Sequence, residues 1–158
     1  MPIPPFVAEL RALVGTRLLW LPGVTAVIRR GDEILLTLRA DDGEWAPVTG
    51  IVDPGEEPAV AAAREAMEEA NVTVTVDRLA AVTVVPDVVY SNGDRSSYLD
   101  LTFACTWAGG EARVNDDENV DVRWWPVDGL PAMTPSTLAR IEAALADETA
   151  ARFTPPPS

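Results

Sequence analysis

Three closely spaced glutamates are the residues best suited to do chemistry in this chain of 158 residues. Glu65, Glu68 and Glu69 are spaced i, i+3 and i+4, so a helix would place them on one face. Like charges at these spacings cost about 0.2–0.5 kcal/mol per pair, and anions near a helix C-terminus oppose the helix dipole. A divalent cation offsets that cost, and Mg²⁺ takes oxygen ligands from a few carboxylates, water and substrate phosphates. The spacing therefore favours a Mg²⁺ site, with Mn²⁺ as the alternative ion.

The alternative interpretation of the same residues is a solvated helix face. In that case Arg64 pairs with Glu68 one turn further along, as i, i+4 ion pairs do on helix surfaces. The two interpretations differ in the expected response to Mg²⁺, because a metal site is stabilised by the ion and a solvated face shows only a small, nonspecific effect of ionic strength.

The helix that carries the glutamates is predicted over Pro58–Ala70, with proline in its first turn and Asn71 as a left-handed C-terminal residue. Small residues on its other side would let it lie close to a sheet. The segment from Gly50 to Glu57 contains Asp-Pro-Gly-Glu and is predicted to be a loop. The predicted buried stripe consists of Ala59, Ala63, Ala66, Met67 and Ala70.

The whole segment GIVDPGEEPAVAAAREAMEEANV, residues 50–72, resembles the Nudix box G-x5-E-x7-R-E-U-x-E-E-x-G-U, in which U is a bulky aliphatic residue. It departs from that pattern at Ala66 and Asn71, neither of which is a charged position. The resemblance implies a Nudix hydrolase with an α/β/α sandwich fold and a mixed sheet. The matching positions are Gly50, Glu56, Arg64, Glu65, Glu68, Glu69 and Val72.

The resemblance also implies roles for these residues. Glu65, Glu68 and Glu69 would bind the metal, together with the backbone carbonyl of Thr49. The general base would be Glu69, Glu68 or the downstream Glu118, whose alternative interpretation is a surface acid in an acidic loop.

Three further residues would support the site. A salt bridge between Arg64 and Glu56 would brace the loop against the helix, and Gly50 would either serve the site or simply make a turn. The candidates for substrate binding are Arg39, Trp45, Tyr90 and Arg95, each of which could instead be an ordinary core or surface residue.

Composition limits the other possibilities. The net charge of −13 disfavours binding to a nucleic-acid backbone, although a small phosphorylated nucleotide remains compatible once a cation is bound. Every cationic side chain is an arginine, and the absence of histidine excludes imidazole zinc sites and His-based triads. The single Cys105 is predicted to be a buried thiol, and no apolar run approaches the roughly 20 residues of a membrane span. We therefore expect a cytoplasmic protein.

The remaining pattern predicts one α/β domain over 18–148, preceded by a helical segment over 1–17 and followed by a flexible Pro-rich tail over 149–158. The N-terminal segment could contribute to a homodimer. A polar loop is predicted from Asp87 to Ser97, with Pro86 closing the strand before it. The predicted helices are Phe6–Val14 and Thr134–Ala146, and the predicted strands are Val24–Arg30, Glu33–Arg39, Trp45–Thr49, Val72–Val85 with an interruption near Asp77, Tyr98–Trp107 and Val120–Pro126.

The predicted activity is metal-dependent hydrolysis of a nucleoside diphosphate linked to another group. Such substrates include a nucleotide sugar such as ADP-ribose, a dinucleotide or a nucleoside triphosphate. Pro86 and Tyr90 lie about where different Nudix subfamilies carry their markers, so the sequence leaves the substrate open. A non-catalytic metabolite-sensing Nudix module and a purely structural interaction domain are the alternatives.

Overall fold

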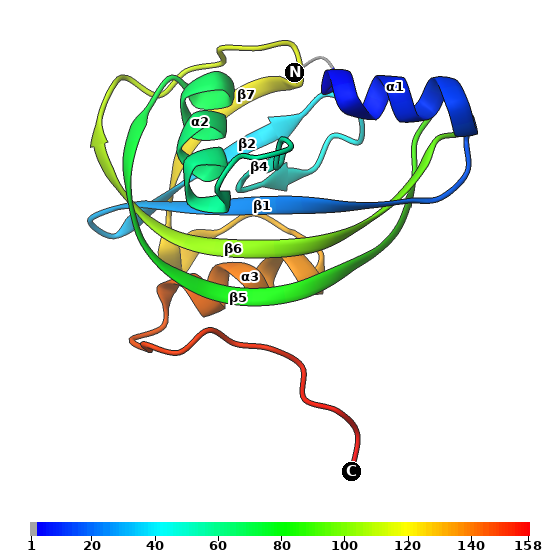
Figure 1. The fold of residues 1–158 in the computed structure, drawn as a ribbon. Coiled ribbons are helices and arrows are strands. Elements are labelled where there is room, and N and C mark those ends of the chain that lie inside the picture. Colours follow the sequence, from blue (N-terminus) through cyan, green and yellow to red (C-terminus); the bar gives the residue numbers. More distant parts are fainter. Residues whose placement is uncertain (1–2) are drawn as a thin grey trace.

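The computed structural model describes residues 3–158 and shows a mixed sheet with helices on both faces (Figure 1). The predicted α/β/α sandwich is confirmed. In chain order the elements are α1 (Pro5–Val14), β1 (Leu19–Arg30), β2 (Glu33–Arg39), β3 (Trp45–Ala46), β4 (Val48–Ile51), α2 (Pro58–Ala70), β5 (Thr73–Val89), β6 (Arg95–Gly109), β7 (Asn119–Pro126), the 3-10 turn η1 (Val127–Gly129) and α3 (Pro135–Leu145).

The sheet has seven strands in the order β3-β2-β1-β6-β5, with β4 pairing to β1 and β7 pairing to β2. Strands β1 and β6 are parallel, and the other pairs are antiparallel. Strand β1 pairs with β2 only at Arg29 and Arg30, whereas its residues 23–26 pair with β4. The short strand β4, which carries Thr49 and Gly50, is therefore held against the middle of β1.

Two hydrophobic clusters lie on opposite faces of the sheet, because alternate side chains of a strand point to opposite sides. Ala26 and Ile28 of β1 pack with α2 in one cluster, and Val27 packs with Ile141 of α3 in the other. Cys105 is buried in the α2 cluster, as predicted. Within residues 3–158, no helix is long and apolar enough to cross a membrane.

Most predicted elements are present, with shifted ends. The hairpin around Gly31 is confirmed, with Arg30 opposite Glu33 and a positive φ of 60° at the glycine. The single strand predicted over Trp45–Thr49 is instead divided into β3 and β4 at Pro47, which has no N–H to donate to a ladder.

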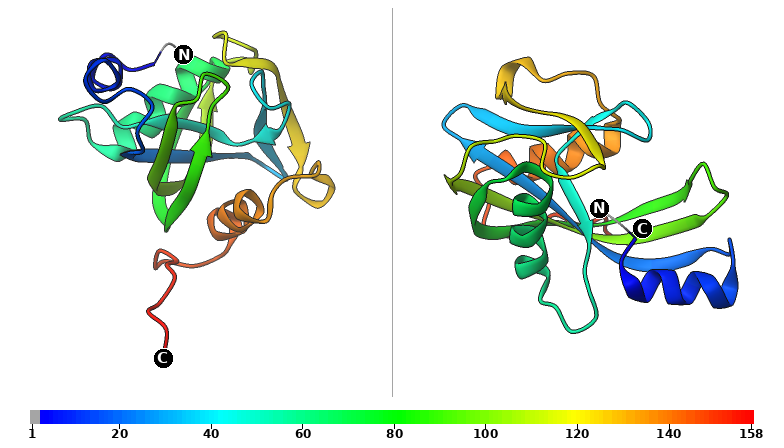
Figure 2. Two further views of the ribbon diagram at one scale, coloured as in Figure 1. Left: turned by 90° about the vertical axis from the view of Figure 1, so that its right-hand side faces the viewer. Right: turned by 90° about the horizontal axis from the view of Figure 1, so that it is seen from above.

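The polar loop predicted from Asp87 to Ser97 is wrong, because β5 and β6 continue into it as one long hairpin. Pro86 does not end β5, since the register shifts between Val85 and Val88 and the proline sits within that irregularity on an outer strand. The interruption predicted near Asp77 is confirmed as another register shift, between Val76 and Arg78. The lengthened hairpin projects from the same end of the molecule as α1 (Figure 2).

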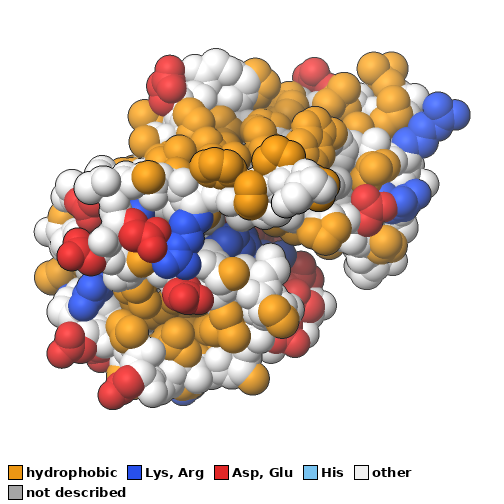
Figure 3. All heavy atoms as spheres, turned by 90° about the horizontal axis from the view of Figure 1, so that it is seen from below, with side chains coloured by type: hydrophobic (Ala, Val, Ile, Leu, Met, Phe, Trp, Pro, Cys, Tyr) orange, Lys and Arg blue, Asp and Glu red, His pale blue; other side chains and the backbone are white. Residues whose placement is uncertain are grey.

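The C-terminal segment is anchored to the outer strand before it leaves the body (Figure 1). Arg152 forms a parallel bridge with Ala81, donating its N–H to the carbonyl of Ala80 at 2.8 Å and accepting from the N–H of Val82 at 2.9 Å. Hydrophobic side chains gather in a band on the face of the molecule seen in Figure 3. The exposed hydrophobic residues of strand β5 and of the C-terminal segment include Val84, Val89 and Phe153.

Candidate active site

Helix α2 ends where the sequence predicts, and its end is fixed by local geometry. Asn71 adopts the left-handed conformation with φ 58° and ψ 36°, and its N–H donates to the carbonyl of Met67 at 3.1 Å. Asparagine tolerates this conformation better than most side chains, which explains why it can stand in place of glycine.

The face of α2 that contacts the sheet differs from the predicted stripe. Met67 is 39% exposed, whereas Glu65 and Glu69 are 0% and 2% exposed. The helix is rotated so that these two carboxylates point into the protein, and Glu68 remains 42% exposed at its side chain. The solvated-face interpretation therefore fails for Glu65 and Glu69 and holds in part for Glu68. The buried residues of α2 are Ala61, Ala62, Glu65, Ala66, Glu69 and Ala70.

Gly50 provides the space into which Glu65 fits. A β-carbon on residue 50 would lie 2.1 Å from Cδ and 2.2 Å from Oε1 of Glu65, far inside contact distance. Gly50 is part of strand β4 and does not form a turn. The glycine is thus required by close approach of a side chain rather than by backbone conformation.

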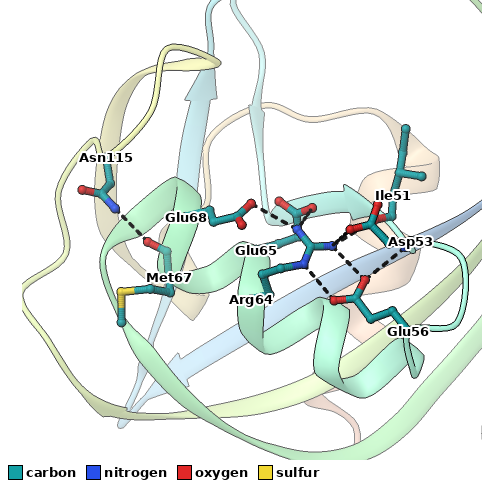
Figure 4. Close-up of polar contacts among 8 residues, drawn as sticks. All are labelled: Ile51, Asp53, Glu56, Arg64, Glu65, Met67, Glu68 and Asn115. Carbon is teal, nitrogen blue, oxygen red and sulfur yellow. Dashed lines mark hydrogen bonds and ion pairs between the residues drawn. The ribbon is translucent and has the colours of Figure 1, made fainter. Parts of the chain in front are cut away.

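Arg64 joins the helix to the preceding loop (Figure 4). Its Nε donates to Oε1 of Glu56 at 2.8 Å and its Nη2 donates to Oε2 at 2.9 Å, so the salt bridge expected between these residues is present and is bidentate. Nη2 also donates to the carbonyl of Ile51 at 3.1 Å. The Arg64 guanidinium and burial act in opposite directions on Glu56, and the hydrogen bonds from Arg64 dominate and lower its pKa.

The same guanidinium contacts the acidic face of the helix. Its Nη1 donates to Oε1 of Glu65 at 2.8 Å and to Oε2 of Glu68 at 3.1 Å (Figure 4). The Arg64 guanidinium therefore donates hydrogen bonds to three carboxylates, those of Glu56, Glu65 and Glu68, and also lies 4.0 Å from Asp53. The second oxygen of Glu65 has no hydrogen-bond partner among the described residues.

The loop between β6 and β7 is attached to the end of α2 and brings further acids to the site. The N–H of Arg113 donates to the carbonyl of Ala70 at 3.1 Å. Asn115 donates from its backbone to the carbonyl of Glu69 at 3.2 Å and from its side chain to that of Met67 at 2.9 Å (Figure 4). These bonds satisfy the last carbonyls of the helix, which have no partners within it.

A cluster of carboxylates results from this attachment. Oxygen atoms of Glu69, Asp116 and Glu118 lie within 4.8 Å of one another, close enough to hold one metal ion. Asn119, the first residue of β7, donates from Nδ2 to Oε2 of Glu69 at 3.1 Å and so fixes the orientation of that carboxylate. Glu69 and Glu118, which come from distant parts of the sequence, are brought together here. Thr49 lies in β4 opposite Thr25, directly before Gly50.

Two of the buried carboxylates have an oxygen without a hydrogen-bond partner among the described residues, and a cation is a suitable partner for such oxygens. Oε2 of Glu65 and Oε1 of Glu69 are buried without a hydrogen-bond partner among the described residues. Burial raises the pKa of Glu65 to about 7, and nearby Glu68 and Glu118 add to this rise against the effect of Arg64. Burial, and then the charges of Glu118 and Glu65, raise the pKa of Glu69 well above its usual value. Carboxylate oxygens of this kind are the ligands that Mg²⁺ and Mn²⁺ accept.

The four candidates for substrate binding fall into two groups. Arg39 lies close enough to Glu69 and Tyr90 to act on them electrostatically, and its guanidinium is held by Asp41 at 3.0 and 2.7 Å. The hydroxyl of Tyr90 is 2.5 Å from that of Tyr98. Arg39 therefore lies near Glu69 on one side and near Tyr90 on the other.

The other two candidates lie elsewhere. Trp45 packs edge to face on Trp125, with ring centroids 5.2 Å apart, in the cluster on the α3 side of the sheet. Arg95 pairs with Asp87 across the exposed β5–β6 hairpin. The structure does not bring these two residues to the acidic cluster.

Three residues of the site are missed by reasoning from the sequence. The sequence pattern marks Asp116 only as part of an acidic loop, and it does not single out Asn115 or Asn119. Their positions around Glu118 in NDDEN are a local signal, but their contacts with α2 depend on where the chain returns after β6.

The fold and the acidic cluster together define an α/β/α protein with a carboxylate site suited to a hard cation. A family model described as the NUDIX domain matches residues 19–145. The chain belongs to the Nudix hydrolase family.

Several known proteins are similar to this chain. An NAD-capped RNA hydrolase NudC from Pseudomonas syringae pv. tomato is 31% identical over 138 residues, which are 82% of this chain and 46% of that protein. A MutT-like protein from Streptomyces ambofaciens is 33% identical over 102 residues, which are 65% of this chain and 60% of that protein. The chain thus spans about half the length of these relatives. The crystal structure of an ADP-ribose pyrophosphatase from Streptococcus suis has a TM-score of 0.62 and 26% identity, covering 88% of this chain and 99% of that one.

Proposed function

We propose that this protein is a cytoplasmic, Mg²⁺-dependent pyrophosphohydrolase that cleaves a nucleoside diphosphate linked to another group. The observation that carries the proposal is the pair of buried carboxylate oxygens, on Glu65 and Glu69, that have no partner among the described residues beside a further cluster of acids. Burying such groups is unfavourable unless a cation or a proton neutralises them.

Each part of the site has a role in this proposal. Glu65, Glu68 and Glu69 would hold the metal with the carbonyl of Thr49, and Asp116 and Glu118 would complete the acidic environment. A divalent ion at such a site neutralises phosphate charge and lowers the pKa of bound water. Glu118, with a pKa raised by burial, is suited to hold the proton removed from the attacking water.

Arg39, which lies near Glu69, and Tyr90, which lies near Arg39, are suited to hold the substrate. The guanidinium of Arg39 would bind a phosphate oxygen, and Asp41 fixes its orientation. Tyr90, paired with Tyr98, offers an aromatic surface for a base or ribose. Trp45 and Arg95 are weaker candidates for this role, because they lie away from the acidic cluster.

The relatives narrow the substrates that we propose. A relative in sequence is named for NAD-capped RNA, and a structural relative is named for ADP-ribose. Both substrates contain an adenosine diphosphate joined to a second group. We therefore propose a dinucleotide such as NAD or a nucleotide sugar such as ADP-ribose ahead of a nucleoside triphosphate.

The proposal is tested by a phosphate-release screen with Mg²⁺ over ADP-ribose, NAD, dinucleoside polyphosphates and nucleoside triphosphates, with a phosphatase added to reveal monophosphate products. We expect turnover of at least one diphosphate-linked substrate, and none in excess chelator. Turnover that persists in chelator would exclude the metal-dependent mechanism. Binding of a nucleotide without any turnover would instead favour the metabolite-sensing module.

A further inference from the structure

The N-terminal helix lies outside the matched domain of residues 19–145, yet its start forms part of a cavity. Ile3, Pro4 and Pro5 line one side of this cavity, which has a volume of about 550 Å³. That volume lies in the range of roughly 300–1,000 Å³ that is usual for small-molecule sites. The cavity is also lined by residues that belong to or adjoin the proposed metal site, namely Asp53, Arg64, Glu68, Asn115 and Asp116.

The side chain of Arg11 holds α1 in this position. Its Nη1 donates to the carbonyls of Gly15 at 3.1 Å and Arg17 at 2.6 Å. Its Nη2 donates to the carbonyl of Arg95 at 2.6 Å and to Oγ of Ser96 at 3.0 Å. The guanidinium thus joins the helix to the start of β6.

An ion pair strengthens the same connection. Nε of Arg11 lies 3.6 Å from Oδ2 of Asp94, and the two side chains are only 12% and 18% exposed. Pro4 and Val7 are buried as well, so the first turn of α1 is packed against the protein. Helix α1 is therefore a fixed element and not a loosely attached extension.

The helix connects two parts of the candidate site. At 1.5 Å per residue, its ten residues span about 15 Å. One end lies at the cavity beside Glu68, and the other is attached to the hairpin tip that carries Tyr90 (Figures 1 and 2). A substrate bound to the carboxylates and to Tyr90 would have α1 along one side.

The charges around the cavity, like the position of α1, disfavour a long anionic substrate. Its acidic lining residues are Asp53, Glu68 and Asp116, and the lining cation Arg64 is engaged by Glu56, Glu65 and Glu68. One or two metal ions can neutralise a diphosphate, but a longer polyanion would meet the net charge of −13 of the whole chain.

We propose that α1, held by Arg11, is a specificity element that admits free small nucleotides and excludes the same nucleotide when it is joined to an RNA chain. This inference rests on the proposed function, since it concerns the substrate of the same site. It assigns to this chain a preference for free NAD or ADP-ribose over an NAD-capped RNA.

The test compares the full-length protein with Arg11→Ala, which removes the connection between α1 and the hairpin. The matched control is Arg17→Ala, which makes the same change of charge three residues after α1 at an exposed side chain. Turnover is measured with free NAD and with a short NAD-capped RNA. Binding of both is measured by calorimetry, and hydrogen exchange reports whether α1 is released.

In the parent and in Arg17→Ala we expect free NAD to be favoured at least tenfold in kcat/KM over the capped RNA. Arg11→Ala should increase exchange in α1 and reduce this preference about tenfold, which corresponds to 1.4 kcal/mol, with turnover of free NAD little changed.

Equal use of both substrates by the parent, or an unchanged preference in Arg11→Ala, would overturn the inference, and so would protection of α1 that does not depend on Arg11. If no substrate is turned over, the proposed hydrolase function fails. The ratio of the two binding constants then still decides whether α1 excludes the RNA.

Discussion

In the described part of the chain, buried acids lie on both faces of the sheet, one aspartate on the α3 face and two glutamates on the α2 face, and their hydrogen-bond partners differ. On the α3 face, Asp100 is 4% exposed and accepts hydrogen bonds from Thr25 at 2.9 and 3.0 Å and from Thr102 at 2.9 Å. Arg140 of α3 lies 3.7 Å from the same carboxylate and donates to Thr25 at 2.8 Å. Both oxygens of the Asp100 carboxylate therefore have hydrogen-bond or ion-pair partners within the protein.

On the α2 face, Glu65 and Glu69 are buried at least as deeply but each keeps an oxygen with no partner among the described residues. Their neighbours are mostly further acids. Burial alone therefore does not distinguish a structural acid from a functional one in this molecule. The distinction lies in whether the surrounding donors match the acceptors, and on the α2 face they do not.

The largest expected effect separates the two groups by activity. Glu69→Gln should lower kcat by about 10²–10⁴-fold, because a neutral amide binds a divalent cation more weakly than a carboxylate does and cannot act as a base. The fold should be retained by circular dichroism. Glu142→Gln, at an exposed glutamate of α3, is the control and should leave kcat unchanged. Near-parent turnover in the Glu69→Gln variant would remove the α2 acids from the catalytic site.

The next effect separates them by stability. Asp100→Ala should lower the free energy of unfolding by about 3–5 kcal/mol, because it leaves Arg140 partly buried without its counterion. In metal-free buffer, Glu69→Gln should be neutral or stabilising, since it removes an unmatched buried charge. Urea denaturation of both variants in chelator measures these values. Equal decreases in the free energy of unfolding for the two variants would mean that Asp100 and Glu69 contribute equally to stability.

Metal binding should distinguish the faces next. At a hundredfold excess over Kd, Mg²⁺ should stabilise the protein by about 2.7 kcal/mol, which raises the melting temperature by roughly 5–11 °C for a chain of this size. The gain should persist in Asp100→Asn and be largely lost in Glu68→Gln. NaCl at equal ionic strength is the control, and an identical shift with NaCl would argue against a specific site.

The smallest expected effect concerns pH. The pKa of Glu65 is raised from 4.5 to about 7, mainly by burial, so the folded metal-free protein binds this proton more tightly than the unfolded chain does. The resulting stabilisation is complete below pH 4.5 and is lost as pH rises through 7. Urea titrations at several pH values in chelator would measure it. Saturating Mg²⁺ should reverse the trend, because the metal requires the ionised carboxylate.

The sequence predicted α2 closely because the signals that define it are local. Proline in its first turn, Asn71 at its end and the spacing of its glutamates and Arg64 all lie within a short segment. The bidentate contact of Arg64 with Glu56 followed from the resemblance and is present. The face of α2 that is buried could not be predicted from the helix sequence. It depends on Gly50 of strand β4, whose lack of a side chain leaves space for Glu65.

The features that were mispredicted depend on distant partners. Pro86 is a strong local signal for a strand end, but an outer strand with shifted register tolerates it. Trp45 and Tyr90 are both candidates for substrate binding in the sequence, and Tyr90 also lies about where a Nudix subfamily carries a marker. In the structure, the packing of Trp45 on Trp125 and the position of Tyr90 near Arg39 distinguish them.

The bridge between Arg152 and Ala81 has a consequence for the behaviour of the protein at high concentration. Strand β5 is the outermost strand on its side of the sheet, and long outer strands with exposed apolar side chains, such as Val84 and Val89 here, invite pairing between molecules. Arg152 occupies backbone groups in the middle of this strand, and the prolines that follow cannot extend the ladder to a neighbour. We therefore expect the C-terminal segment to protect the sheet against self-association, so that a chain shortened before Arg152 keeps its turnover but aggregates at lower concentration.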